Sequence, residues 1–266
     1  MKKSEELKNL DLKILVATHK QYWTPSEDVY LPIHVGCKGE PKFAMIGDNT
    51  GENISDKNKN YCELTALYWA WKNLNCDYLG LCHYRRYFGF QKYFDGIERR
   101  KQRIFQRADY EELLKNFDVI LPFQRRYYIE TVRSQYEHAH SPRDLEQIEK
   151  IIVNRHPNYI RSFRAVMNRR RLHLWNMFVM KKSFVDDYCK WLFDILFTYE
   201  NWMDKNNLSD KKWRLFGFIS ERLLDVWLHG KNFKTVEVDA IMLEKVNWFR
   251  KGSDFLRRKF FRGTSQ

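Results

Sequence analysis

Cysteine is sparse in this sequence, and the few that occur are not arranged in pairs. The chain has five cysteines among its 266 residues, and no two of them form a Cys-x-x-Cys pair. The odd number argues against a complete disulfide framework, and the missing pairs argue against a zinc ribbon. The simplest interpretation is a set of free thiols in a reducing cytoplasm.

Long apolar runs are also absent. No stretch approaches the roughly 18 uninterrupted apolar residues that a bilayer-spanning helix needs. The first residues, Met1–Glu6, lead into no apolar core of a signal peptide. We therefore expect a cytoplasmic protein that is soluble or peripherally attached to a membrane.

The common glycine-rich signatures of nucleotide and ester chemistry are missing as well. The sequence contains no Gly-x-x-x-x-Gly-Lys-Ser/Thr loop, no Gly-x-Gly-x-x-Gly after a strand, and no Gly-x-Ser-x-Gly. These absences argue against P-loop ATP chemistry, a dinucleotide-binding Rossmann unit and the common esterase elbow.

Acidic residues are outnumbered, which points to an anionic partner. The chain has 47 Lys and Arg against 34 Asp and Glu, a net charge of +13. Nucleic acid, an anionic membrane and a phosphorylated substrate would all fit this charge. The basic residues concentrate at 99–101, 125–126, 169–171 and the C-terminal end rather than along one stripe. Composition alone therefore does not choose among these partners.

Aromatic residues are abundant, and the hydrophobic pattern alternates between strands and helices. Nine Trp, fifteen Tyr and nineteen Phe can supply a large core. Apolar runs predict strands at 12–18, 77–82, 118–122 and 175–180, and helical spacing predicts helices at 64–74, 110–116, 182–199 and 214–229. We expect a turn-rich loop at 25–59 and a polar, helical region at 127–172. Such alternation predicts an α/β fold with a mixed, mostly parallel sheet flanked by helices and a helical second half.

A dense basic and aromatic cluster follows the predicted strand 77–82. If the strand continued, alternation would place His83 and Arg85 on one face and Tyr84 and Arg86 on the other. An imidazole and a guanidinium on one face would suit a diphosphate, which Arg binds through two oxygens. The alternative is an exposed strand end that forms surface salt bridges.

Several further residues are candidates for a site. Glu221 has apolar neighbours on its helix, so its pKa would be raised and it would serve as a general base; an ion pair with Arg222 or another Arg is the alternative. His19 and Lys20 end the first strand, where α/β folds bind ligands. Asp48 and Asn53 could hold a ribose or a base, or could form turns. His138 and His140 have metal-ligand spacing, but no third ligand accompanies them.

Four ordered segments resemble one family. Residues 60–69, 80–88, 176–180 and 217–223 are similar to the domain of unknown function 4422 family of bacterial capsule and exopolysaccharide gene clusters, and the resemblance covers about residues 12–240. It implies a glycosyltransferase of the GT-A type, with galactofuranose transfer from UDP-galactofuranose in some members. GT-A enzymes hold a divalent metal on an Asp-x-Asp motif at the end of a central strand. This chain has His83-Tyr84-Arg85 there, so we expect no metal and no other cofactor.

The resemblance also implies roles for individual residues. We expect an inverting hexosyltransferase in which Glu221 is the catalytic base. The residues expected to contact the UDP-sugar donor and its diphosphate are Thr18, His19, Lys20, Asp48, Asn53, Glu63, His83, Arg85 and Arg86. Those expected to contact the acceptor or the sugars are Tyr84, His140, Asn176 and Met177.

The C-terminal end mixes basic and bulky apolar residues. We expect one catalytic domain at 1–248 and a tail at 249–266 that lies on the anionic inner face of the plasma membrane. Polyprenyl-diphosphate-linked acceptors lie there, and an oligosaccharide is the other acceptor considered. The alternative for the tail is a solvated, disordered segment.

The rival functions are a nucleic-acid-binding protein and a non-catalytic carbohydrate-binding protein. The dispersed basic residues and the absence of a recognisable motif argue against nucleic acid.

Overall fold

The computed structural model describes residues 10–39, 45–91, 96–208 and 213–244. The strands are β1 (Leu12–Thr18), β2 (Tyr30–His34), β3 (Ile46–Gly47), β4 (Tyr78–His83), β5 (Arg86–Gly89), β6 (Val119–Pro122), β7 (Arg125–Arg126), β8 (Arg171–Leu172), β9 (Phe178–Lys181) and β10 (Thr235–Met242). The α-helices are α2 (Asn58–Tyr61), α3 (Leu64–Asn73), α4 (Ile97–Lys101), α5 (Arg107–Leu114), α6 (Val132–Glu137), α7 (Pro142–Arg155), α8 (Ile160–Met167), α9 (Lys182–Lys205) and α10 (Leu215–His229). Two short 3₁₀ turns lie at Ser55–Lys57 and Pro157–Tyr159.

The N-terminal half of the sheet is parallel. Strand β1 pairs in parallel with β2 on one side and β4 on the other, and β2 pairs in parallel with β3. Leu12, Ile14, Leu15 and Val16 of β1 are completely buried, as expected for a central strand covered on both faces. Because these strands run the same way, their carboxyl ends meet at one edge of the sheet.

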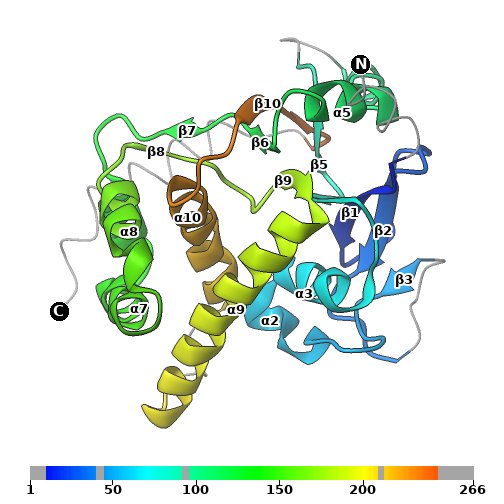
Figure 1. The fold of residues 1–266 in the computed structure, drawn as a ribbon. Helices are drawn as coiled ribbons and strands as arrows, with labels where there is room; N and C mark the ends of the chain where they lie inside the picture. Colours follow the sequence, from blue (N-terminus) through cyan, green and yellow to red (C-terminus); the bar gives the residue numbers. More distant parts are fainter. Residues whose placement is uncertain (1–9, 40–44, 92–95, 209–212, 245–266) are drawn as a thin grey trace.

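The second half makes the sheet mixed. Strand β9 pairs antiparallel with β4 and with β6, while β10 runs parallel to β6. The mixed α/β fold class predicted from the sequence is confirmed (Figure 1). Strands β2 and β3 lie in the segment predicted as a loop, and the prediction of secondary structure also missed β10.

The chain reverses directly after β4, which corrects one prediction. Tyr84 and Arg85 form a tight turn, and His83 of β4 pairs antiparallel with Arg86 of β5. Strand β5 then pairs antiparallel with β10. The predicted alternation across 83–86 is therefore wrong. His83 and Arg86 face each other across two strands, and Arg85 lies at the turn.

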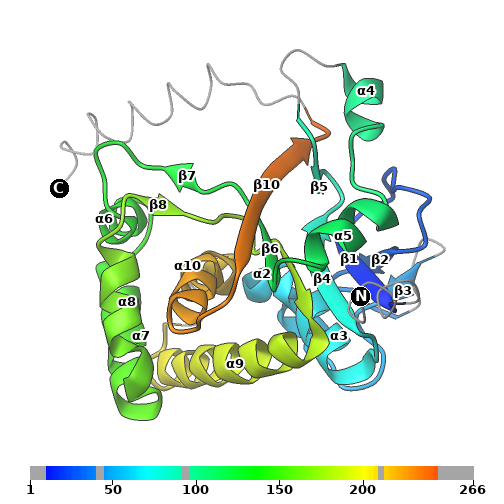
Figure 2. The same cartoon turned by 45° about the horizontal axis from the view of Figure 1, so that its top comes forward.

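Helices cover the sheet and form most of the second half of the chain. The larger core cluster joins the buried faces of α3, α9 and α10 to the sheet, and α10 also packs on α8. Figures 1 and 2 show α9 crossing beneath the sheet, with α7 and α8 at the far side of α10. No helix in the described part of the chain is long and apolar enough to cross a membrane. The predicted tail at 249–266 lies outside the described residues.

Candidate functional site

The end of β1 presents two cationic side chains. The hydroxyl of Thr18 donates to Lys20 O at 2.6 Å and accepts from the Lys20 N–H at 3.3 Å, and this closes a turn that exposes His19 and Lys20. The ring of Tyr84 supports both residues. It lies edge-on to His19 at 5.3 Å and 5.0 Å from the Lys20 ammonium. Thr18 thus shapes this end of β1, while His19 and Lys20 face outward.

Arg85 extends the positive charge from the end of β4. Its Nη1 donates to Glu244 Oε2 at 2.8 Å, and the Lys20 Nζ lies 3.9 Å from Glu244 Oε1. Burial and then the neighbouring Lys20 and Arg85 lower the pKa of His19. One carboxylate therefore serves two cations here, and positive charge remains in excess.

Arg86 is a half-buried cation that forms no ion pair with any described residue. Its guanidinium lies 5.3 Å from the ring centroid of Trp175, and its buried Nε has no hydrogen-bond partner among the residues that the structure describes. Burial, and then repulsion from Arg85, lowers its pKa, while Glu63 and Glu221 oppose this effect. None of the carboxylates in the described residues lies within ion-pair distance of Arg86. Such a group gains most from an added anion, because it has already lost part of its hydration.

Arg214 belongs to the same site, and the sequence analysis missed it. It precedes α10 with a left-handed φ of 62°, and its guanidinium lies over the rings of Trp213 at 5.4 Å and Phe218 at 5.8 Å. Its charge lowers the pKa of both His19 and Arg86. No signal in the sequence marks this position, because Arg214 comes near His19 and Arg86 only in the tertiary fold.

His83 has a different role from the phosphate contact predicted for it. Its Nε2 lies 2.6 Å from Trp175 O. Because a carbonyl only accepts, Nε2 carries the hydrogen and donates it. Burial lowers the pKa of His83, although Glu63 opposes this effect. His83 is therefore a neutral side chain that holds the backbone of Trp175.

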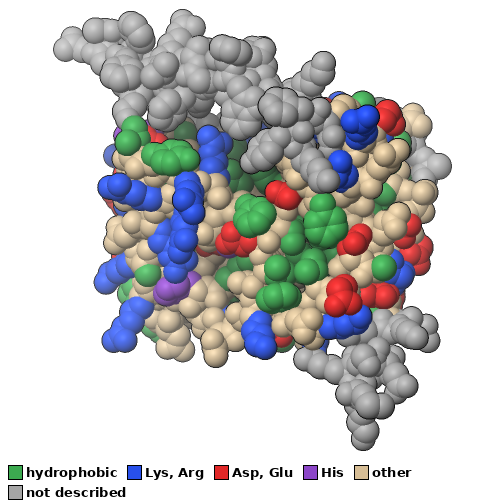
Figure 3. Space-filling view, turned by 90° about the horizontal axis from the view of Figure 1, so that it is seen from above, with side chains coloured by type: hydrophobic (Ala, Val, Ile, Leu, Met, Phe, Trp, Pro, Cys, Tyr) green, Lys and Arg blue, Asp and Glu red, His purple; other side chains and the backbone are tan. Residues whose placement is uncertain are grey.

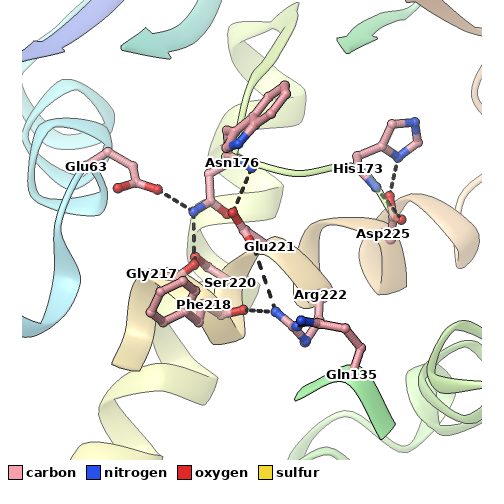
Figure 4. A network of polar contacts seen from close by, with 11 residues as sticks. Glu63, Gln135, His173, Asn176, Gly217, Phe218, Ser220, Glu221, Arg222 and Asp225 are labelled. Carbon is pink, nitrogen blue, oxygen red and sulfur yellow. Dashed lines mark hydrogen bonds and ion pairs between the residues drawn. The ribbon is translucent and has the colours of Figure 1, made fainter. Parts of the chain in front are cut away.

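A strained segment before β9 joins three elements. Trp175 and Asn176 have left-handed φ values of 72° and 54°, which are costly for residues other than glycine. Asn176 Nδ2 donates to Glu63 Oε1 at 2.7 Å and to Gly217 O at 3.1 Å (Figure 4). Asn176 thus ties α10 to Glu63, which stands immediately before α3.

Glu221 lies on the same face of α10. Its Oε1 accepts the Trp175 N–H at 2.8 Å (Figure 4). Burial raises its pKa to about 7, with a smaller contribution from Glu63, while Arg222 opposes the rise. Arg222 Nη1 lies 3.7 Å from Glu221 Oε2, but this guanidinium donates to Gln135 Oε1 at 2.6 Å and to Phe218 O at 2.7 Å. The ion pair with Arg222, one of the two alternatives considered from the sequence, is present but long. It leaves the pKa of Glu221 raised, as the other alternative expected.

A second polar network, which the sequence analysis did not find, lies one helical turn further along α10. The backbone N–H of His173 donates to Asp225 Oδ2 at 3.1 Å, and its ring bonds to the other oxygen of Asp225 and, at 3.2 Å, to Glu237. Burial alone would lower the pKa of His173, but the hydrogen bonds to Asp225 and Glu237 raise it to about 9. His173 is therefore a buried, protonated residue that fastens this part of the chain to α10.

Two of the predicted donor residues are used within the protein. Asp48 is completely buried. Its carboxylate accepts the N–H groups of Gly36 at 2.9 Å and Cys37 at 3.1 Å, and the hydroxyl of Ser55. Asn53 bonds to Gly51 O at 2.9 Å and to the Ser55 N–H at 3.2 Å. Both residues therefore act as turn formers, the alternative considered from the sequence.

The predicted acceptor residues do not all reach one surface. Met177 is completely buried in the smaller core cluster, so its side chain cannot meet an acceptor, and this prediction is wrong. Asn176 is 2% exposed and acts through Glu63 and Gly217. Tyr84 is buried beneath the cations. The ring of His140 lies 4.7 Å from that of Phe218 on α10, which keeps it near the first turn of the helix.

A divalent metal does not fit the residues at the end of β4. His83 donates to a carbonyl, and Arg85 and Arg86 are cations, so these side chains offer no anionic oxygen of the kind that Mg²⁺ or Mn²⁺ prefers. Among the described residues, no group of three or more His, Cys, Asp or Glu could hold a metal ion. Metal independence stays a prediction.

Comparison with known proteins shows similarity in both sequence and fold. Residues 13–232 match the family model described as domain of unknown function (DUF4422). A solved structure, the WbbM bifunctional glycosyltransferase in its apo form, superposes with a TM-score of 0.78 and 28% sequence identity. The similarity covers 88% of this chain and 46% of the other, so this chain spans about half the length of that protein. No curated protein matches the sequence.

Proposed function

Because the chain belongs to the DUF4422 family and shares its fold with a bifunctional glycosyltransferase, we propose that it is a glycosyltransferase that uses a nucleotide sugar. A chain that matches about half of a bifunctional enzyme has the size expected of one catalytic unit. In finer detail, we propose that the enzyme transfers a hexosyl unit from a UDP-sugar to a hydroxyl of a lipid-linked or oligosaccharide acceptor. The family resemblance suggests galactofuranose as the sugar, and capsule or exopolysaccharide synthesis as the pathway.

The positive charge around Arg86, which makes no direct ion pair with the described residues, carries this proposal. Arg86 and Arg214 make no ion pair within the described residues, and Lys20 and Arg85 share a single carboxylate. These cations surround the carboxyl ends of β1 and β4, where open α/β sheets bind ligands. A diphosphate supplies the missing negative charge, and guanidinium groups match its oxygens in pairs.

Glu221 supplies the base. In its ionised form it takes the proton of the acceptor hydroxyl, whose oxygen then forms a bond to the anomeric carbon of the donor. The bond between that carbon and the β-phosphate oxygen breaks, and UDP leaves with the bonding electrons. Arg86, Arg85 and Arg214 stabilise the charge that develops on the leaving phosphate, which preorganised cations do effectively. Attack from the face opposite the leaving group inverts the anomeric centre.

Binding of UDP tests the donor site. Thermal unfolding followed with UDP, GDP, ADP and CDP should show stabilisation by UDP above the others, because a ligand that binds only the folded state raises its stability. We expect Arg86→Gln to weaken UDP binding about 10- to 100-fold, the size of one lost charge-assisted contact. Arg107→Gln is the matched control, because Arg107 pairs with Asp28 at 2.7 Å, outside the proposed site. Equal affinity in both variants would refute the diphosphate site.

Chelation tests the metal question separately. With Arg86 and its neighbours holding the diphosphate, UDP release from the donor should continue in excess EDTA. Complete loss of activity, restored by Mg²⁺ or Mn²⁺, would contradict metal independence and leave UDP binding as a separate result.

A further inference from the structure

A two-stranded ribbon of arginines, which form no ion pair with the described residues, borders the site. Arg125 and Arg126 form β7, which pairs antiparallel with Arg171 and Leu172 of β8, and Arg126 stands directly opposite Arg171. Like charges opposite each other destabilise a strand pair. The two strands pair despite this repulsion, because the backbone pairing fixes their register and Leu172 is completely buried.

The arginines of this ribbon point to an external anion. Arg125, Arg126, Arg170 and Arg171 are exposed. In the described part of the chain none of them forms an ion pair, and Arg170 donates only to a carbonyl, Tyr128 O, at 3.4 Å. Figure 3 shows Lys and Arg gathered on the left of the upper face, the side on which Figures 1 and 2 place β7, β8 and α8.

Large apolar side chains flank these charges. Phe123 is 56% exposed before β7, and Tyr128 and Ile129 are 83% and 62% exposed after it. Basic residues beside exposed aromatic and aliphatic residues are typical of segments that lie in the headgroup layer of a membrane. Nucleic acid fits less well, because Ile129 offers a base no π face for stacking.

We propose that this arginine ribbon, with Phe123, Tyr128 and Ile129, binds the surface of a bilayer that contains anionic phospholipids. The arginines interact with the phosphate groups, while the three apolar side chains enter the boundary between headgroups and acyl chains. Beyond Arg171 the chain passes through His173 to Trp175, whose N–H binds Glu221. A membrane held by the ribbon would therefore lie beside the proposed base, where a lipid-linked acceptor has to arrive.

Sedimentation of the full chain with vesicles tests this surface. We expect binding to phosphatidylcholine vesicles that contain phosphatidylglycerol, and little binding to phosphatidylcholine alone. A basic residue near an anionic surface contributes about fivefold to binding. The triple variant Arg125→Gln, Arg126→Gln, Arg171→Gln should therefore bind about 100-fold more weakly.

The matched control removes the same charge elsewhere. Lys181, Lys190 and Lys205 are exposed on β9 and α9, and changing all three to Gln should leave vesicle binding close to that of the wild type. A second variant, Tyr128→Ser with Ile129→Ser, should lose the binding that persists at high salt. Equal binding of the two triple variants, or equal binding to neutral vesicles, would overturn the proposal. Ribbon-dependent binding of a single-stranded oligonucleotide without vesicle binding would overturn it too. UDP binding is measured separately, so either proposal can fail alone.

Discussion

The backbone N–H of Trp175 donates a 2.8 Å hydrogen bond to Oε1 of Glu221. The carbonyl of the same residue accepts a 2.6 Å bond from His83 Nε2. One residue with a left-handed backbone therefore connects the end of β4 to α10. The proposed base is therefore held in a fixed position relative to β4. Arg85 and Arg86, which follow β4, belong to the proposed diphosphate site.

The pH dependence of transfer should report Glu221. Its pKa is about 7, so the ionised base is lost as pH falls through that value, and kcat/KM should fall with it. Glu63 contributes to this raised pKa. Glu63→Gln keeps an oxygen for Asn176 but removes the charge, so the acidic limb of the profile should move to lower pH.

Profiles of kcat/KM against pH for the wild type and Glu63→Gln check this expectation. Glu146→Gln, an exposed change on α7, is the control and should leave the limb in place. An unmoved limb in Glu63→Gln, or a limb moved to higher pH, would contradict the role of Glu63.

Stability should show the cost of keeping Glu221 buried. The folded-state pKa of Glu221 is raised from 4.5 to about 7. The stability of the folded state that depends on the protonated carboxyl group is therefore fully present below pH 4.5, and it is lost as pH rises through about 7. This shift corresponds to about 3 kcal/mol. Glu221→Gln lacks the ionisation, so at pH 8 it should be more stable than the wild type by up to about this amount. Near pH 4 the two proteins should be equally stable. Urea unfolding at both pH values measures the difference, and a variant less stable than the wild type at pH 8 would contradict the argument.

Much of the fold was predictable because its signals are local. The apolar run of β1, the helical spacing of α3 and the alternation of strands with helices led to the correct fold class. Strands β2 and β10 were not found, because β2 contains Pro32 within a turn-rich stretch and β10 is largely half-buried. Their pairing partners, rather than their own composition, make them strands.

The site was predictable only in part, for the same reason. Glu221, Arg86 and Lys20 were chosen as candidates because chemically active residues stood beside apolar runs, and their roles stay predictions. The turn at Tyr84 and Arg85 could not be predicted, because the chain reverses there so that β5 can pair with β10, which is distant in the sequence. Arg214 and His173 become neighbours of the site only when α10 packs. Met177 was wrongly assigned because it is buried in the smaller core cluster, whose members come from separate strands and helices.

The ion pair of His173 should stabilise the protein in a pH-dependent manner. The folded-state pKa of His173 is raised from 6.5 to about 9. Its stabilisation is therefore complete below pH 6.5 and is lost as pH rises through about 9. Asp225→Asn should lower the free energy of unfolding by about 2–4 kcal/mol at pH 6, because it leaves a buried group without its charged partner.

The matching measurement is urea unfolding at pH 6 and at pH 10. The difference between the wild type and Asp225→Asn should shrink at the higher pH, where His173 is neutral in both proteins. Asp187→Asn, an exposed change on α9, should show no such dependence. A constant difference across pH would mean that Asp225 acts through packing alone.

Gly80 allows β4 to lie closely between its neighbours. A Cβ at this position would meet Ile14 Cδ1 at 2.6 Å, Val179 Cγ2 at 2.9 Å and Phe178 O at 3.0 Å. The backbone oxygen cannot move without shifting β9, so Gly80→Ala should destabilise the protein by about 1–3 kcal/mol, the usual cost of overpacking. Gly217 on α10 is the matched control, because a Cβ there meets only ordinary contacts, the nearest at 3.5 Å from Cys62 Sγ. Gly217→Ala should be neutral or stabilise the helix by up to about 1 kcal/mol. Urea unfolding of the two variants compares them directly, and equal stability would show that β4 has more room than the structure gives it.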